Sequence, residues 1–177
     1  MEELIAKRYI KAIEKNSTVE SMKMMASVFS VLAESFSNKK FVQIINNPNI
    51  DKNHKSEILL KAVKSADSKS VENLIKLLAE NNRINIIPAI AEVLRKNVAT
   101  KTKNYNGVVY SDSDIDEKVI KDLSSGLGKK FDSTISLEFV KNSFNGIKVD
   151  VQDLGIEIGF SKSRINYQIV EHIIKAI

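Results

Sequence analysis

The chain has 177 residues, of which 43% are hydrophobic and 28% charged, figures typical of a soluble globular protein. It contains no cysteine, which excludes disulfide bonds, thiolate metal sites and cysteine nucleophiles. No uncharged apolar run approaches the roughly 18–20 residues that a transmembrane helix needs. The N-terminal residues have the pattern of neither a signal peptide nor a transit sequence, so we expect a cytosolic protein.

Six helices are predicted in the first part of the chain, where apolar residues recur every three or four positions. They span Glu2–Lys15, Thr18–Phe36, Phe41–Asn46, Asp51–Val63, a segment around Val71–Leu78 and one around Ile87–Val98. Ser17 and Glu20 predict a capping box for the second, and Pro88 is tolerable only near the first turn of the sixth. Six helices with short links indicate a compact helical bundle.

The second part alternates between strand and helix patterns. Strands are predicted over Gly107–Tyr110 and Thr134–Val140, and on both sides of a hairpin turn at 152–155. One helix is predicted from an N-cap at Ser113 to a C′ residue at Gly128. A last helix runs from Ser163 to the end. We interpret this part as a β-α-β-β-α domain, so the predicted fold class is mainly α with a small α+β part.

Glycine and charge divide the chain at the same place. All six glycines lie in the last 71 residues, and helix interiors disfavour glycine. Residues 1–105 carry 18 basic and 11 acidic side chains, net +7, whereas residues 106–177 carry 9 and 11, net −2. We therefore expect two domains, over 1–104 and 105–177.

Catalytic, cofactor and metal sites find no support in the residue pattern. His54 and His172 lie at polar positions of predicted helices, which favours a solvated surface role over a catalytic one. Asp112, Asp114 and Asp116 alternate as in a calcium loop, but the glycine and final glutamate of that motif are missing. We instead interpret these aspartates as residues at the start of the predicted helix, where the helix dipole favours negative charge. We expect no enzyme, no cofactor and no metal.

A net charge of +5 raises nucleic acid as a partner. Lysine outnumbers arginine 23 to 4, however, and the lysines are scattered without interleaved aromatic residues. Specific readers favour bidentate arginine, and single-strand binders favour stacking rings. A solvated basic surface is therefore favoured, and a cytosolic helical adaptor or a basic nucleic-acid-binding protein is the alternative function.

The first and fifth helices carry more apolar surface than one buried face needs. In the first helix two adjoining stripes are apolar, made by Leu4, Ile5, Ala6, Tyr9, Ile10, Ala12 and Ile13. In the fifth, Leu77 lies beside the core line. Such a helix is either central or covers a second apolar surface. A groove between these two helices that accepts an amphipathic helix is the resulting hypothesis, and two simply central helices are the alternative.

Three segments carry a resemblance to a known family: Ala6–Ile13, the stretch from Phe41 through Asn47-Pro48 to Leu59, and Leu74–Ile84 followed by Pro88. They resemble the delta subunit of bacterial F-type ATP synthase, which is related to the mitochondrial oligomycin sensitivity conferral protein. The third segment, which continues to Ile90, is the most specific match. Within it, the family usually has Gly or Lys at the position of Asn82, between Asn81 and Arg83. Near the C-terminus, Gly159-Phe160-Ser161 departs from the Asp-x-Ser that many members have.

The resemblance implies a non-catalytic stator subunit that links the catalytic head to the peripheral stalk and resists rotor torque. The bundle would hold the N-terminal helix of an alpha subunit, and the C-terminal part would hold the end of stalk subunit b. The implied alpha contacts are Tyr9, Ala12, Ile13, Leu74 and Leu77, and the stalk contacts are Ile165, Ile169 and Ile173. The resemblance also implies a peripheral position on the cytoplasmic face of the bacterial plasma membrane, held there only through the complex, without cofactor or nucleic acid.

Overall fold

The chain forms two compact units, Met1–Val98 and Ala99–Ile177, in the computed structural model, which describes residues 2–161 apart from the side chain of Ser65. The sequence pattern places the boundary six residues later, after residue 104. The boundary falls inside the sixth helix because Ala99 is buried with the sheet residues of the second unit. The helix predicted from Ser163 onwards lies outside the described residues.

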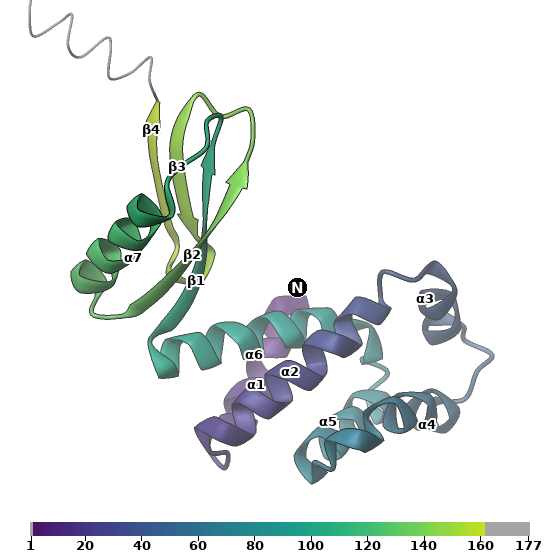
Figure 1. Cartoon of the computed structure of the whole chain (residues 1–177). Helices are drawn as coiled ribbons and strands as arrows, with labels where there is room; N and C mark the ends of the chain where they lie inside the picture. The colour runs from purple at the N-terminus through teal and green to yellow at the C-terminus, as the bar shows by residue number, and fades with distance from the viewer. Residues whose placement is uncertain (1, 162–177) are drawn as a thin grey trace, which may run out of the picture. The chain divides into compact units, whose positions relative to one another are not determined.

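The first unit is a bundle of six helices (Figure 1). In chain order they are α1 (Glu2–Glu14), α2 (Val19–Ser35), α3 (Lys39–Asn46), α4 (Lys52–Val63), α5 (Lys69–Glu80) and α6 (Ile87–Thr102). Short 3-10 turns follow α4 and precede α6, the second of them being η2 (Ile84–Ile86). The predicted six-helix bundle is therefore confirmed, and Pro88 lies in the first turn of α6, where its missing N–H costs nothing.

Side-chain caps determine where these helices begin. Asp51 caps α4 as predicted, its carboxylate accepting a hydrogen bond from the backbone N–H of Asn53 at 3.0 Å. The cap predicted at Ser17 is wrong, because the Oγ1 of Thr18 accepts the bond from the backbone N–H of Ser21 at 3.2 Å. Asn38 caps α3, which therefore begins two residues before the predicted Phe41.

The core of the bundle is a continuous apolar cluster. Its largest fully buried side chains include Phe29, Met22 and Met25 from α2, with Leu78 from α5 and Leu94 from α6. Full burial of each such side chain stabilises the fold by about 1.5–3 kcal/mol. The methionines at 22 and 25 thus fill the core, as the helical spacing predicts.

The second unit is a four-stranded sheet with one helix. The strands are β1 (Asn104–Ser111), β2 (Thr134–Lys141), β3 (Gly146–Val151) and β4 (Ile156–Ser161), in the spatial order β2-β1-β3-β4. β1 and β2 pair in parallel and are joined through α7 (Glu117–Phe131), whereas the other pairs are antiparallel. Both sides of the predicted hairpin form strands. The described part of this unit therefore has four strands, one more than the predicted order β-α-β-β-α contains.

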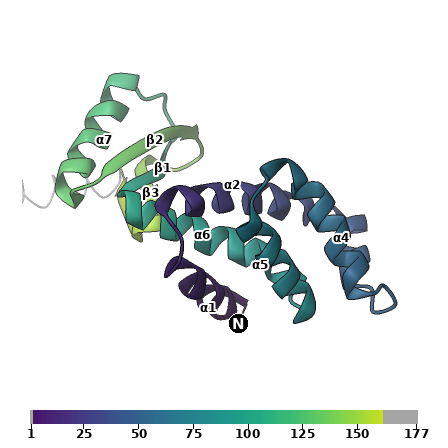
Figure 2. The same cartoon turned by 90° about the horizontal axis from the view of Figure 1, so that it is seen from below.

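One face of this sheet forms the core of the second unit. Tyr105 and Val109 of β1, Ile135 of β2, and Val149 and Val151 of β3 are buried there. Ile115 and Leu127, before and within α7, pack against this cluster, and Figure 2 shows α7 beside β2. Strand alternation therefore buries one set of side chains and leaves the other in solvent.

Both ends of α7 differ from the sequence prediction. The helix begins after Asp116, whose carboxylate accepts the backbone N–H of Lys118 at 2.9 Å, so Ser113 is not the cap. It continues past Gly128 to Phe131 and is closed by Asp132, which has a left-handed φ of 48°. Gly128 serves a different purpose, because a Cβ there would lie 2.7 Å from the carbonyl oxygen of Ser133. The glycine lets the returning chain approach the helix.

We predict that Gly107→Ala destabilises the second unit by about 2 kcal/mol or more. A Cβ at this position would lie 2.7 Å from Val151 Cγ2, 2.8 Å from the carbonyl oxygen of Asp150 and 2.9 Å from Leu137 Cδ2. Gly126→Ala is the matched control, since no heavy atom lies within 4 Å and alanine favours the helix by about 1 kcal/mol. Urea unfolding followed by circular dichroism measures both. A Gly107→Ala protein as stable as the parent would contradict the packing.

Candidate functional site

Helix α1 keeps apolar surface that the bundle does not cover. Ala6 and Ile10 are fully buried and define its core face. Tyr9 and Ile13 are half-buried against the edge of that core. Ala12, at the next position around the helix, is exposed. The second apolar stripe that the sequence predicts on α1 therefore lies at the surface, beside the core face.

On α5 the two candidate leucines have opposite environments. Leu74 is only 2% exposed and belongs to the core, whereas Leu77 is 43% exposed. Residues three apart on a helix are surface neighbours, so Leu77 lies next to the position where Leu74 enters the core. Of this pair, Leu77 is the accessible apolar contact, and Leu74 supports the helix beneath it.

The turn after α5 closes the helix with a defined hydrogen-bond pattern. The backbone N–H of Asn82 donates to the carbonyl of Ala79 at 3.0 Å, and that of Arg83 donates to Leu78 at 2.7 Å. These are the two bonds of a Schellman motif, whose C′ residue takes a left-handed conformation. Asn82 is that residue, with φ 54°. Asparagine tolerates this conformation better than most residues, so it suits this position.

Arg83 joins this turn to α1. Its guanidinium Nη1 donates to the hydroxyl oxygen of Tyr9 at 3.1 Å, and its Cζ lies 5.9 Å from the centre of the Tyr9 ring. The edge of α1 that carries Tyr9 therefore faces the C-terminal end of α5, and Figure 2 shows α1 and α5 on the same side of α2. The sequence motif includes Arg83, but periodicity alone does not single it out, because the contact joins residues 74 positions apart.

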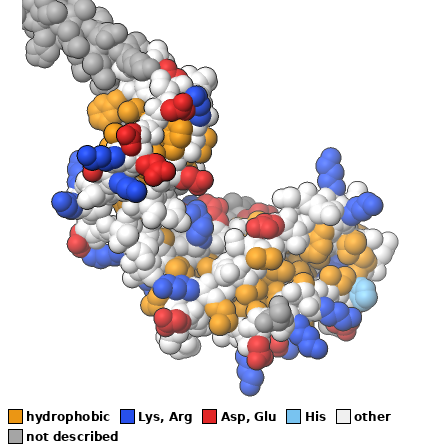
Figure 3. Space-filling view, viewed as in Figure 1, with side chains coloured by type: hydrophobic (Ala, Val, Ile, Leu, Met, Phe, Trp, Pro, Cys, Tyr) orange, Lys and Arg blue, Asp and Glu red, His pale blue; other side chains and the backbone are white. Residues whose placement is uncertain are grey.

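A second group of exposed apolar side chains lies on α2. Val31 is 63% exposed and Met24 is also exposed, on a side of the helix away from the buried Phe29. Figure 3 shows hydrophobic side chains over this part of the first unit. Apolar exposure alone therefore does not identify a site, and the Tyr9–Arg83 contact distinguishes the surface on α1 and α5.

Polar hollows beside α5 have a different character. One of about 270 Å³ is lined by Ile45, Asn46, Lys52, Lys55, Ala79, Asn82, Ile84 and Asn85. Another, of about 480 Å³, is lined by Lys52, Asn53, Ser56, Glu57, Lys76, Ala79 and Glu80. Neither includes Tyr9 or Leu77, so the candidate surface is separate from these hollows.

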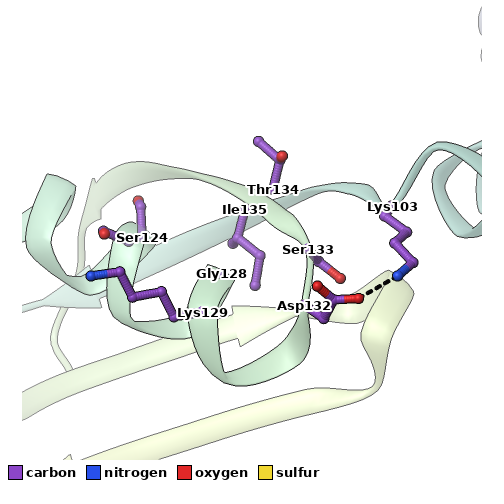
Figure 4. Close-up of a pocket in the computed structure, with 9 residues that line it drawn as sticks. Lys103, Ser124, Gly128, Lys129, Asp132, Ser133, Thr134 and Ile135 are labelled. Carbon is purple, nitrogen blue, oxygen red and sulfur yellow. Dashed lines mark hydrogen bonds and ion pairs between the residues drawn. The ribbon is translucent and has the colours of Figure 1, made fainter.

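The second unit has a hollow of about 570 Å³ where α7 ends and β2 begins (Figure 4). Lys103 and Asp132 form an exposed ion pair at its rim, and both take left-handed backbone conformations. Their hydrogen bond lowers the pKa of the Asp132 carboxyl and raises the pKa of the Lys103 ammonium. The remaining lining is mostly serine, threonine and lysine. This arrangement offers a solvated ion pair and no nucleophile with an adjacent base.

Metal and membrane features are absent from the described part of the chain. Among residues 2–161, no three histidine, aspartate or glutamate side chains gather where they could hold a metal ion. Asp116 caps α7 and Asp114 pairs with Lys141 at 2.9 Å, so these aspartates have structural partners. None of the helices described is long and apolar enough to cross a bilayer. His54 is exposed.

The stalk contacts expected at Ile165, Ile169 and Ile173 lie outside the described residues, as does His172. The remaining candidates divide by burial. Tyr9, Ala12, Ile13 and Leu77 offer apolar surface, and Leu74 lies in the core.

Comparison with known proteins places the chain among subunits of one complex. Residues 5–163 match the family model described as ATP synthase delta (OSCP) subunit. The chain is 67% identical to the ATP synthase subunit delta of Sulfurimonas denitrificans and 41% identical to that of Nitratiruptor sp., over the full length of both chains in each case. Its fold is similar to a chain in the cryo-EM structure of the Toxoplasma gondii mitochondrial ATP synthase hexamer, with a TM-score of 0.66, 14% identity and coverage of 98% of this chain and 97% of that one.

We predict that Leu74→Ala and Leu77→Ala differ sharply in their effect on folding. Leu74→Ala should lower the free energy of unfolding by about 2–5 kcal/mol, because it leaves a cavity in the core. Leu77→Ala should cost less than about 1 kcal/mol, because the side chain is largely in solvent. Urea unfolding of the full chain measures both. Equal losses would mean that Leu77 serves folding and is not spare surface.

Proposed function

The chain belongs to the ATP synthase delta (OSCP) subunit family and is a subunit of the F-type ATP synthase, in which we propose that it acts as a non-catalytic stator. In this role it links the alpha/beta catalytic head to subunit b of the peripheral stalk and resists the torque of the rotor. It sits at the cytoplasmic face of the bacterial plasma membrane, held there through the complex.

The observation that carries the proposal is the apolar surface on α1 and α5 that folding leaves uncovered. Tyr9, Ala12 and Ile13 on one helix and Leu77 on the other offer anchors of the kind that hold an amphipathic helix. We propose the N-terminal helix of an alpha subunit as the occupant. Leu74 contributes from below by holding α5 in place.

Rigid helices suit a load-bearing contact. Each candidate side chain lies on a helix whose opposite face is fully buried, so little ordering is needed when a partner binds. Preorganisation reduces the entropic cost of association, and buried apolar anchors slow dissociation. A slow dissociation rate is what a stator needs, since torque acts on it continuously.

The charge around this surface favours an acidic partner. Arg8 and Lys11 are exposed on α1 beyond Ala12, the exposed Lys15 directly follows the helix, and Arg83 lies at the other side. Rim charges of this kind raise association rates and set orientation more than they add affinity. We therefore propose that the side of the alpha-subunit helix facing the basic residues of α1 carries aspartate or glutamate.

The second unit is proposed to hold the end of stalk subunit b. Following the family resemblance, the contact is assigned to Ile165, Ile169 and Ile173, whose four-residue spacing predicts one apolar stripe. Two partners would then bind two separate units of one chain, which is the arrangement that a mechanical link requires. No cofactor, metal or nucleic acid enters this function.

Leu77→Asp tests the alpha site. The substitution should weaken binding of a synthetic alpha N-terminal peptide by about 3 kcal/mol or more, because it places an unpaired charge in an apolar contact. Val31→Asp is the matched control, since it changes a more exposed apolar residue of the same unit on α2. Isothermal titration calorimetry with the full chain measures both affinities.

Equal affinity of the parent and Leu77→Asp proteins would refute the site, as would an equal loss in Val31→Asp. Salt separates this function from the alternative. A basic nucleic-acid binder loses affinity steeply as salt rises, whereas an apolar surface with a charged rim should lose little.

Ile169→Asp tests the stalk assignment. A charge in the middle of the apolar stripe should abolish copurification with subunit b while leaving affinity for the alpha peptide unchanged. Pull-down from detergent-solubilised membranes, followed by identification of the copurifying chains, measures the first effect. Retained subunit b, or a parallel loss of the alpha peptide, would overturn the assignment of separate sites.

A further inference from the structure

The chain contains two Asn-Gly pairs, Asn106-Gly107 and Asn145-Gly146. In such a pair the backbone nitrogen of glycine can attack the side-chain carboxamide of the asparagine, because glycine has no Cβ to obstruct the approach. The reaction also requires rotation of the asparagine backbone. Local structure therefore decides which Asn-Gly pair reacts.

Asn145 lies in the connection between β2 and β3. It is exposed, and within the described residues its carboxamide makes no hydrogen bond. The other asparagine of this connection is held in place, because Asn142 Oδ1 accepts the backbone N–H of Phe144 at 2.8 Å. Of the two, only Asn145 has a side chain free to turn towards the following peptide bond.

The nitrogen that must attack belongs to Gly146, the first residue of β3. Gly146 pairs with Ser161 at the very end of the β3–β4 ladder. Terminal pairs open most easily, at a small fraction of the free energy of global unfolding. Asn145 itself lies outside the ladder, so its backbone can rotate while the strand remains paired.

The first pair has the opposite environment. Asn106 and Gly107 lie in the middle of β1, where each is in register with β2 through Ser136 and Leu137. Both glycines are buried, so burial does not distinguish the two pairs. At Gly107, however, β3 also approaches from the other side, where a Cβ would lie 2.8 Å from the carbonyl oxygen of Asp150 and 2.7 Å from Val151 Cγ2. An extended residue in a central strand cannot rotate towards ring closure unless the ladder opens.

We propose that Asn145 is a site of spontaneous deamidation and that Asn106 is protected by the sheet. The Gly146 nitrogen forms a bond to Cγ of Asn145, its proton passes to solvent, and the side-chain nitrogen leaves as ammonia. Water then opens the resulting succinimide at one of its two carbonyls. One product is aspartate, and the other is isoaspartate, in which the backbone runs through the side-chain carboxyl carbon.

Isoaspartate at this position would disturb the start of β3. The backbone at Gly146 passes so close to β4 that a Cβ there would lie 2.0 Å from the carbonyl oxygen of Phe160. The modified backbone is one methylene longer, so Gly146 cannot keep both this approach and its pairing with Ser161. The reaction also adds a carboxylate to a connection already beside Asp112, whose backbone N–H donates to the carbonyl of Phe144 at 3.2 Å.

The test compares both sites in one folded protein. The full chain is incubated at mildly alkaline pH, and peptide mapping by mass spectrometry follows the conversion of each asparagine, with isoaspartyl methyltransferase labelling to identify isoaspartate. We expect Asn106 to react at least about tenfold more slowly than Asn145. Asn106 reacts only after β1 opens locally, and an opening free energy of about 1.4 kcal/mol already lowers the rate tenfold.

A parallel incubation in urea is the control, because both pairs have the same intrinsic reactivity once the sheet is lost. We expect similar rates at the two sites there. Asn145→Gln should remove the reactive site from the loop peptide and leave the rate at Asn106 unchanged. The proposal fails if Asn106 reacts as fast as Asn145 in the folded chain, or if folding slows Asn145 by a factor of about ten or more relative to urea.

Discussion

The contact between Arg83 and Tyr9 relates the two helices on which the candidate surface depends. The shared apolar core holds α1 and α5 in place, and this contact links their exposed edges directly. The contact exists because α5 ends in a Schellman turn whose left-handed position is occupied by Asn82. That turn directs Arg83 onto the Tyr9 ring and hydroxyl. Local backbone geometry at one helix end thus determines how two segments far apart in the sequence present a shared surface.

The proposed stator role requires surfaces that bind other subunits. Several of the ionisable groups that the structure describes form exposed ion pairs, such as Lys103 with Asp132 and Lys148 with Glu157. Exposed pairs of this kind contribute little to stability. Apolar packing therefore provides the stability of the bundle. The apolar side chains that stay exposed are the ones that can contact a partner. The same type of interaction serves folding and assembly, separated only by which side of a helix it occupies.

Periodicity predicts the six helices and the strands because the spacing of buried residues repeats within each element. It fails at the ends of elements. Whether Ser17 or Thr18 caps α2 depends on which residue leaves the helical conformation, and the pattern of apolar residues does not report that. Gly128 has the sequence signature of a helix stop, yet it lies inside α7 because the chain returns against it at Ser133. For the candidate site, spacing predicts the apolar surplus on α1 and α5 and places Leu77 beside the core line, but only the fold shows that Leu74 is too buried to offer surface and reveals Arg83.

Pairs of identical residues in different surroundings show why context decides function here. Leu74 and Leu77 have the same side chain and lie three residues apart, but folding buries the first and leaves the second exposed. Asn106 and Asn145 precede a glycine alike, but the centre of the sheet holds the first in register with β2, whereas the second stands outside the ladder. In both pairs the residue that can bind or react is the one that core packing or strand pairing leaves free. A partner helix and a chemical modification therefore obey the same rule, because each requires groups that secondary structure and core packing have left free.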